Sequence, residues 1–221
     1  MKRILVFGDS NSWGYTDEDN GQRYEKRWPI LLSQDLIQKG FNTEIIEDCL
    51  PGRTTNIDDP QDGIHLNGAK VLKSSLLSHS PIDLVILMLG TNDLKFRFQR
   101  TAENIADGIK ELIQIVLDTN SGSGGWHDVN KSNLVVICPP SLGEKSYDPN
   151  WINFKEWEGG LEKSTELHFS FEKVCSQMGV HLIDANEFCQ SSSIDPIHWS
   201  KKMHLKFSEN LAKIIDQKIK L

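Results

Sequence analysis

Five short apolar runs, separated by stretches with helical periodicity, constrain the fold of this chain more than any other feature. The apolar runs cover residues 3–8, 43–47, 83–89, 133–138 and 180–184. The stretches with apolar residues at helical spacing cover residues 27–39, 101–117 and 161–178, and a last one runs from about Lys206 to Ile219. Strands that alternate with helices form a parallel sheet with helices on both faces. The chain is therefore predicted to have an α/β fold, a flavodoxin-like three-layer sandwich around a five-stranded parallel sheet.

Residues that begin and end helices agree with this interpretation. Thr101 is a plausible N-cap for the helix expected at 101–117. Gly40 and Gly179 follow the ends of two other expected helices. The glycine- and serine-rich stretch at 120–125 is interpreted as a surface loop and not as a domain linker. A chain of 221 residues with a hydrophobic share of 38% can bury a sizeable core, and we expect one domain over residues 1–221.

Charge and cysteine usage argue against several classes of protein. The net charge of −7 disfavours a nucleic-acid partner, because binding to a phosphate backbone needs a basic face. The four cysteines, Cys49, Cys138, Cys175 and Cys189, form no C-x-x-C pair, which argues against zinc-ribbon and thioredoxin-like sites. Cys138 ends an apolar strand and Cys175 lies on an apolar helix face, so both are expected to be buried thiols.

The N-terminal residues carry no visible targeting segment. The chain enters its first predicted strand at once and shows no signal peptide. No apolar run approaches the ~18 residues that a membrane-spanning helix needs. These features favour a cytoplasmic location and no membrane partner.

A serine follows the first predicted strand, in the run Phe7-Gly8-Asp9-Ser10. Open α/β sheets bind ligands outside the carboxyl ends of their strands, which is where this serine is expected to lie. A serine hydroxyl is a poor nucleophile alone and needs a base that a third group orients. The alternative is a turn or N-cap serine, because Gly-Asp-Ser is also ordinary turn chemistry.

A carboxylate and an imidazole stand three residues apart near the end of the chain, in Asp195-Pro196-Ile197-His198. Asp195 can accept a hydrogen bond from one ring nitrogen of His198 and fix its tautomer. The other nitrogen can then take the Ser10 proton as the hydroxyl attacks an acyl group. The alternative for His198 is a histidine of a surface loop.

Two further residues that follow strands can stabilise an oxyanion. Asn92, in Gly90-Thr91-Asn92-Asp93, can donate from its side-chain amide. Gly52 follows the second strand and can donate its backbone N–H. Turn formation is the alternative for both, through a turn asparagine and through a glycine with positive φ.

Two other functions compete with acyl transfer. Asp9, Asp48 and Asp93 each follow a strand, and such carboxylates can hold Mg²⁺ for phosphoryl transfer, but the chain has no glycine-rich phosphate loop. The acidic loop with Asp58, Asp59 and Asp62 lacks the spacing of an EF-hand calcium site. The other alternative is a non-catalytic small-molecule binding module on the same fold, which has no need of a nucleophile together with its base.

Together these segments resemble the four sequence blocks of the SGNH hydrolases, also called GDSL-type esterases. The blocks are Gly8-Asp9-Ser10, Gly52, Gly90-Thr91-Asn92-Asp93 and Asp195-Pro196-Ile197-His198. The similarity extends to the arylesterase and acyltransferase (perhydrolase) branch, through the segments 2–14, 53–60, 66–69, 83–93 and 154–166. The resemblance covers nearly the whole chain.

The resemblance implies an enzyme, a serine esterase that cleaves short acyl esters, including aryl esters, through an acyl-enzyme, with possible transfer of the acyl group to alcohols or peroxide. Ser10 would be the nucleophile, His198 the general base and Asp195 its orienting acid. The oxyanion hole would consist of the Ser10 and Gly52 N–H groups and the Asn92 side chain. The resemblance further implies structural roles for Asp9 and Asp93, no cofactor or metal, and a homo-oligomer.

One position departs from the family pattern, and a group of aromatic residues bears on specificity. Asn11 replaces the usual leucine after the nucleophile and is expected to alter the polarity of the pocket. The substrate pocket is predicted to include Asn11 and a set of aromatic residues, Trp13, Trp151, Phe154 and Trp157. The alternative for the aromatic residues is that some of them cover the core or an interface. A narrow aromatic pocket would favour small acyl groups such as acetyl.

Overall fold

The computed structural model of the chain describes residues 1–16, 18 and 21–219. A parallel sheet of five strands forms its centre, in the order β2-β1-β3-β4-β5. The strands are β1 Lys2–Gly8, β2 Thr43–Cys49, β3 Leu84–Met88, β4 Asn133–Cys138 and β5 His181–Asp184. This strand order is that of the flavodoxin-like folds, so the predicted architecture is confirmed.

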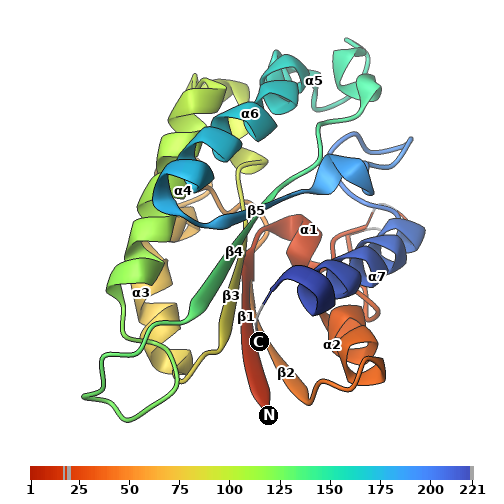
Figure 1. Ribbon diagram of the computed structural model, residues 1–221. Coiled ribbons are helices and arrows are strands. Elements are labelled where there is room, and N and C mark those ends of the chain that lie inside the picture. Colours follow the sequence, from red (N-terminus) through yellow and green to blue (C-terminus); the bar gives the residue numbers. More distant parts are fainter. Residues whose placement is uncertain (17, 19–20, 220–221) are drawn as a thin grey trace.

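Helices cover both faces of the sheet, as Figure 1 shows. The helices are α1 Ser10–Trp13, α2 Trp28–Gln38, α3 Gly68–His79, α4 Ala102–Asp118, α5 Phe154–Trp157, α6 Gly160–Met178 and α7 Lys201–Lys218. The helices α3, α4 and α6 lie on one face, and α2 and α7 lie on the other. The short α5 lies beyond the carboxyl ends of the strands. This is the same end of the sheet at which α1 follows β1.

Strand alternation produces the two hydrophobic cores. In β1, Leu5 and Phe7 pack into the core under α3, α4 and α6, whereas Ile4 and Val6 pack into the core under α2 and α7. Successive side chains of a strand point to opposite faces, so a central strand covered on both sides must be apolar throughout. This explains why β3 is a continuous run of buried residues.

Two helices differ from the expected pattern. The helix α3 was not predicted, because Ser75 lies on its buried face and interrupts the apolar stripe. The helix α7 begins at Lys201, more than a turn before the expected start near Lys206. Its first turn is polar, and the side chain of Ser200 caps it by accepting a hydrogen bond from the Met203 N–H. At α4, in contrast, Thr101 forms the expected N-cap as part of a capping box with Asn104.

The cysteines are unpaired thiols. Cys138 and Cys175 are buried, as predicted, and Cys189 is buried as well, whereas Cys49 is half-buried. Within the residues that the structure describes, no helix combines the length and the apolar character needed to cross a bilayer.

A buried histidine joins the two helices on one face of the sheet and couples stability to pH. His204 of α7 is 0% exposed, and its Nδ1 accepts a hydrogen bond of 3.3 Å from the Trp28 N–H of α2. Burial lowers the pKa of His204 to about 4, and the nearby charges of Arg27 and His198 act in the same direction. As the pH falls from ~6.5 towards 4, the unfolded chain therefore binds a proton here that the folded chain excludes, which destabilises the fold.

We expect the variant His204→Asn to remove this pH dependence, because Oδ1 of asparagine occupies the place of Nδ1 and can still accept from the Trp28 N–H but does not titrate. Between pH 7 and pH 4 the variant should gain about 3 kcal/mol of unfolding free energy relative to the wild type. Urea unfolding of both proteins at the two pH values measures this difference. Parallel changes in the two proteins would contradict the role of His204.

Candidate active site

The loops after three adjacent strands meet at one edge of the sheet. Because β1 lies between β2 and β3, the segments that follow these strands are neighbours. Ser10 follows β1, Gly52 follows β2 and Asn92 follows β3. The segment between β5 and α7 brings Asp195 and His198 to the same place, and all five residues line one cavity.

The turn at Ser10 is tightly constrained. Ser10 begins the four-residue helix α1, and the Asp9 carboxylate caps this helix by accepting from the Asn11 N–H. A Cβ at Gly8 would stand 2.3 Å from the Oγ of Ser12, so only glycine allows α1 to pack back onto the end of β1. The Gly-Asp-Ser sequence thus sets the position of the serine, and Ser10 is 5% exposed at the cavity.

The imidazole of His198 lies between a hydroxyl and a carboxylate. Its Nδ1 is 2.6 Å from Oδ2 of Asp195, and its Nε2 is 3.0 Å from Oγ of Ser10. The other carboxylate oxygen of Asp195 accepts from the backbone N–H groups of Ile197 and His198, at 2.8 and 3.3 Å. These bonds fix the carboxylate on the Nδ1 side, so the Nδ1–H tautomer leaves Nε2 free to accept the Ser10 proton.

Two carboxylates near Ser10 have shifted pKa values of opposite direction. Burial opposes ionisation of Asp195, but the hydrogen bond and charge of His198 and the two N–H groups outweigh it and hold its pKa below the usual value. Burial raises the pKa of Asp9 to about 6, although the Asn11 N–H and the charge of His198 act against this rise. Asp195 is therefore the carboxylate that is ionised throughout the neutral and mildly acidic range.

The residues predicted for the oxyanion hole lie together at the cavity. The side-chain amide of Asn92 donates to the carbonyl of Arg53 at 3.2 Å, which fixes its orientation and leaves its second N–H available. Gly52 has a φ of +87°, the positive value expected of a turn glycine. It also lines the cavity. Donors that are held in place before the reaction are what oxyanion stabilisation requires.

The cavity itself is small, with a volume of about 260 Å³. It is lined by residues from the loops after β1, β2 and β3, from the segment that leads into and includes α5, and from the loop before α7: Ser10, Tyr15, Pro51, Gly52, Asn92, Lys95, Asn153, Glu156, Trp157, Asp195, Ile197 and His198. Pockets for drug-sized ligands usually measure roughly 300–1,000 Å³, so this cavity fits a smaller molecule.

The structure brings only one of the five predicted pocket residues into the cavity wall, namely Trp157. Trp151 packs against the core beneath α4 and α6, and Trp13 lies under the guanidinium of Arg23. Phe154 is half-buried at the start of α5 and does not line the cavity. Trp151 therefore covers the core, which was the alternative to a place in the substrate pocket.

Asn11 has a different position from the one expected. It is buried and is not among the lining residues. Its side-chain amide donates to the carbonyl of Ile197 at 3.1 Å. Asn11 therefore ties the turn that carries Ser10 to the loop that carries His198, a contact that a leucine cannot make.

Several lining residues were missed by the sequence analysis. The ring of Tyr15 stacks on His198, with 4.1 Å between the ring centroids and 36° between the planes. Lys95 and Glu156 form a charged pair in the cavity wall. The only available signal was proximity in sequence, since Lys95 follows Asn92 closely and Glu156 adjoins Trp157. Single charged or aromatic residues in loops do not otherwise reveal which way they face.

The carboxylates considered for metal-dependent chemistry are each engaged elsewhere. Asp48 pairs with Arg53 at 2.7 Å, and Asp93 pairs with Arg100 at 2.7 Å and accepts from the Thr55 N–H at 2.9 Å. Within residues 1–16, 18 and 21–219, no group of three or more His, Cys, Asp or Glu residues is arranged to hold a metal ion. Asp9 accepts from the Asn11 N–H of its own turn and Asp93 from the Thr55 N–H of the loop after β2, the kind of contact with loop backbone that the resemblance implies.

The acidic loop after β2 is neutralised by basic side chains. Asp58 binds Lys70 at 2.6 Å, while Asp62 binds Arg97 at 2.7 Å and the buried Asp59 also binds Arg97. These ion pairs attach the loop to α3 through Lys70 and to the turn Phe96–Phe98 through Arg97.

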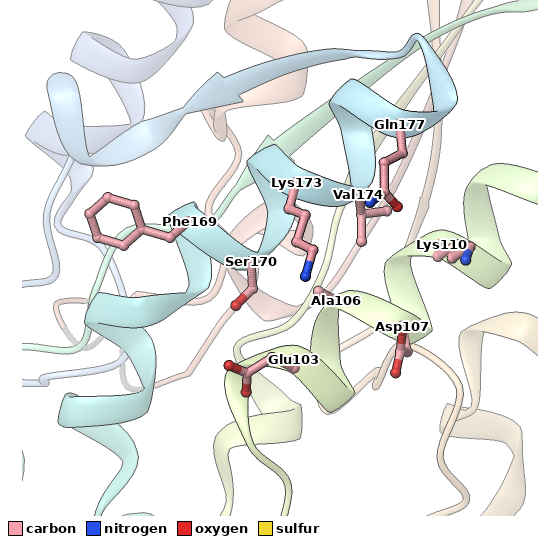
Figure 2. Close-up of a pocket in the computed structure, with 9 residues that line it drawn as sticks. All are labelled: Glu103, Ala106, Asp107, Lys110, Phe169, Ser170, Lys173, Val174 and Gln177. Atoms are coloured by element: carbon pink, nitrogen blue, oxygen red, sulfur yellow. The ribbon is translucent and has the colours of Figure 1, made fainter.

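A larger hollow, of about 490 Å³, lies between α4 and α6 (Figure 2), and Ser10 is not among the residues that line it. Its wall includes Glu103, Asp107 and Lys110 of α4 and Phe169, Ser170 and Lys173 of α6. Ser170 and Lys173 are three residues apart on α6, yet no hydrogen bond joins their side chains within the described part of the chain. Ser170 and Lys173 are therefore not arranged as a nucleophile bonded to its base.

Residues 6–206 match the GDSL-like lipase/acylhydrolase family. An arylesterase from Vibrio mimicus is 29% identical over 147 residues, which are 66% of this chain. The matched region spans 60% of the length of that relative.

Solved structures resemble the chain over almost its whole length. The inhibitor-bound aryl esterase from M. smegmatis has a TM-score of 0.87 and 38% identity, and the match covers 98% of this chain and 99% of that one. Est24, a carbohydrate acetylesterase from Sinorhizobium meliloti, has a TM-score of 0.87 and 35% identity with the same coverage of both chains.

Proposed function

The chain belongs to the GDSL-like lipase/acylhydrolase family, and from this we propose that it is a carboxylic ester hydrolase with Ser10, His198 and Asp195 as its catalytic triad. The observation that carries the proposal is the position of His198. Its ring contacts the Ser10 hydroxyl at 3.0 Å on one side and the Asp195 carboxylate at 2.6 Å on the other, at the wall of a cavity.

In the first half of the reaction, the Ser10 oxygen attacks the ester carbonyl while Nε2 of His198 takes its proton. The resulting tetrahedral oxyanion accepts hydrogen bonds from the Asn92 amide and from the Ser10 and Gly52 N–H groups. Asp195 stabilises the imidazolium that forms and keeps its own negative charge. Collapse of the tetrahedral intermediate breaks the bond to the alcohol oxygen, which takes the proton from His198 and leaves an acyl-Ser10 ester.

The second half of the reaction repeats these steps with water as the nucleophile. Nε2 of His198 takes a proton from water as its oxygen attacks the acyl-enzyme carbonyl. Collapse of the second tetrahedral intermediate releases the carboxylic acid and returns the proton to Ser10. We further propose that an alcohol or hydrogen peroxide can take the place of water, which would yield a new ester or a peracid. Assembly as a homo-oligomer and a cytoplasmic location stay predictions.

The size of the cavity supports short acyl groups as substrates. Its volume of about 260 Å³ is bounded by the bulky side chains of Tyr15, Trp157 and Ile197. The similarity to an aryl esterase and to a carbohydrate acetylesterase supports acetyl and aryl esters as substrates for this chain as well. We therefore propose acetyl esters as the preferred class.

Hydrolysis of p-nitrophenyl esters of increasing acyl length tests the proposed activity. We expect kcat/KM to be highest for the acetate and to fall steeply for the octanoate, because the longer chain does not fit the cavity. EDTA should leave the rate unchanged, since no step uses a metal. No cleavage of any of these esters, or a rate that EDTA abolishes, would contradict the proposed function.

A further inference from the structure

Two oppositely charged side chains, Lys95 and Glu156, line the same cavity as Ser10 and His198. The Nζ of Lys95 lies 3.3 Å from Oε1 of Glu156. Lys95 is only 7% exposed, whereas the side chain of Glu156 is 35% exposed. Desolvation of a charge is costly, and the ammonium of Lys95 is compensated by Glu156, by Asp62 at 3.9 Å and by the ring of Trp157, so it is kept charged in the wall of the cavity.

The pair is held firmly in place. Lys95 follows the turn Asn92–Leu94, and its backbone N–H donates to the carbonyl of Asn92 at 3.3 Å. Glu156 of α5 accepts a hydrogen bond of 2.7 Å from Arg97. Arg97 in turn binds Asp59 and Asp62 of the acidic loop. The position of the pair relative to the Asn92 amide is therefore set by the fold.

We propose that Lys95 and Glu156 bind a hydroxyl group of the ester substrate, so that the enzyme prefers esters of polyols, including partially acetylated sugars, over esters of alkyl alcohols of the same size. This inference rests on the proposed ester hydrolysis at Ser10. It assigns specificity to two residues outside the triad and the oxyanion hole.

A hydroxyl group fits this pair because it both donates and accepts. The ammonium of Lys95 has three N–H donors, of which one suffices for Glu156. Both Lys95 and Arg97 contact Oε1 of Glu156, and within the described part of the chain no hydrogen bond reaches Oε2. A substrate hydroxyl can accept from Lys95 and donate to Oε2, and both bonds are strengthened by charge. An alkyl group in the same place would cover the two charges and offer no partner.

The surrounding charges favour a neutral ligand over an ionic one. Lys95 and Arg97 contribute two positive charges, and Glu156, Asp59 and Asp62 contribute three negative charges. This excess of negative charge opposes a carboxylate or phosphate ester. A cationic substrate would meet the ammonium of Lys95 directly. A hydroxyl group carries no charge and avoids both penalties.

Two acetates of nearly equal size separate hydroxyl recognition from general activity: glycerol monoacetate (2,3-dihydroxypropyl acetate) and propyl acetate. We expect the wild type to favour glycerol monoacetate by roughly tenfold or more in kcat/KM, because hydrogen bonds to charged partners contribute about this much. In the double variant Lys95→Met/Glu156→Leu this preference should fall to about unity. The double variant removes both charges together, so neither is left buried without its partner.

The matched control is Lys155→Met/Glu158→Leu, which changes the same residue types at exposed positions in and beside α5 that do not line the cavity. It should keep the wild-type preference. If the double variant at the cavity does not fold, Glu156→Leu alone should still reduce the preference several-fold.

Equal rates on the two acetates in the wild type would overturn the inference, as would a double variant that folds and keeps the preference. Failure of the proposed function has a different signature. In that case the wild type cleaves neither acetate nor p-nitrophenyl acetate, or cleavage persists without the Ser10 hydroxyl.

Discussion

The variant Ser10→Ala should lose activity on p-nitrophenyl acetate by a factor of about 10⁴ or more in kcat. The Ser10 oxygen forms the bond to the acyl group, so without it neither the acyl-enzyme nor its hydrolysis can occur. The remaining rate would come from water that His198 and the oxyanion hole activate in the cavity. Steady-state kinetics with the purified variant measures the loss.

Ser12→Ala is the matched control for this variant. Ser12 lies on the same short helix and is 0% exposed, and its hydroxyl has no hydrogen-bond partner among the described residues. We expect Ser12→Ala to keep activity close to the wild type. We also expect Ser10→Ala to keep the wild-type unfolding temperature within a few degrees, because it removes one cavity-facing hydroxyl. Cleavage that survives in Ser10→Ala would show that another group is the nucleophile.

The variant Asp195→Asn should lose activity by about 10⁴-fold in kcat while its fold is retained. Oδ1 of the asparagine can still accept from the N–H groups of Ile197 and His198. Its amide would then face Nδ1 of His198 as a donor and force this nitrogen to accept. The ring proton would move to Nε2, which could no longer take the proton of Ser10.

A second aspartate–histidine contact provides the control for Asp195→Asn. Oδ2 of Asp184 lies 3.3 Å from Nδ1 of His168, and neither residue lines the cavity. Asp184→Asn should therefore leave kcat and KM unchanged. A comparable loss in both variants would indicate a general effect on the fold, and full activity in Asp195→Asn would contradict the role of Asp195.

The strands and most long helices were predictable because their signal is local. Continuous apolar runs such as Leu84–Met88 mark strands that are buried on both faces, and Thr101 marks the start of α4 through its own side chain. The helix α3 was not predictable in this way, since the buried Ser75 weakens its apolar stripe. Leu72 and Leu76 have helical spacing, but this pair alone is too short a pattern to predict a helix of twelve residues, and their packing into the core with α4 stabilises it.

The candidate triad and oxyanion residues were predictable for a related reason, whereas the walls of the cavity were not. Ser10, Gly52 and Asn92 each follow a strand, and strand ends meet at one edge of a parallel sheet. Asp195 and His198 were recognisable as a carboxylate and an imidazole three residues apart. The aromatic residues Trp13, Trp151 and Phe154 carried no such constraint, and their side chains lie elsewhere. Nothing in the sequence indicated that Lys95 and Glu156 pair with each other in the wall of the cavity.

The sequence by itself determined the alternation of strands and helices and the residue types that follow each strand, because periodicity and turn chemistry act over a few neighbouring residues. Only the tertiary structure decided which distant residues touch. Ser10 and His198 are 188 positions apart, and their contact depends on the packing of the loop before α7 against α1, where Asn11 binds Ile197. Contacts of this kind arise from the folding of the whole sheet and its helices, so no local pattern in the chain records them.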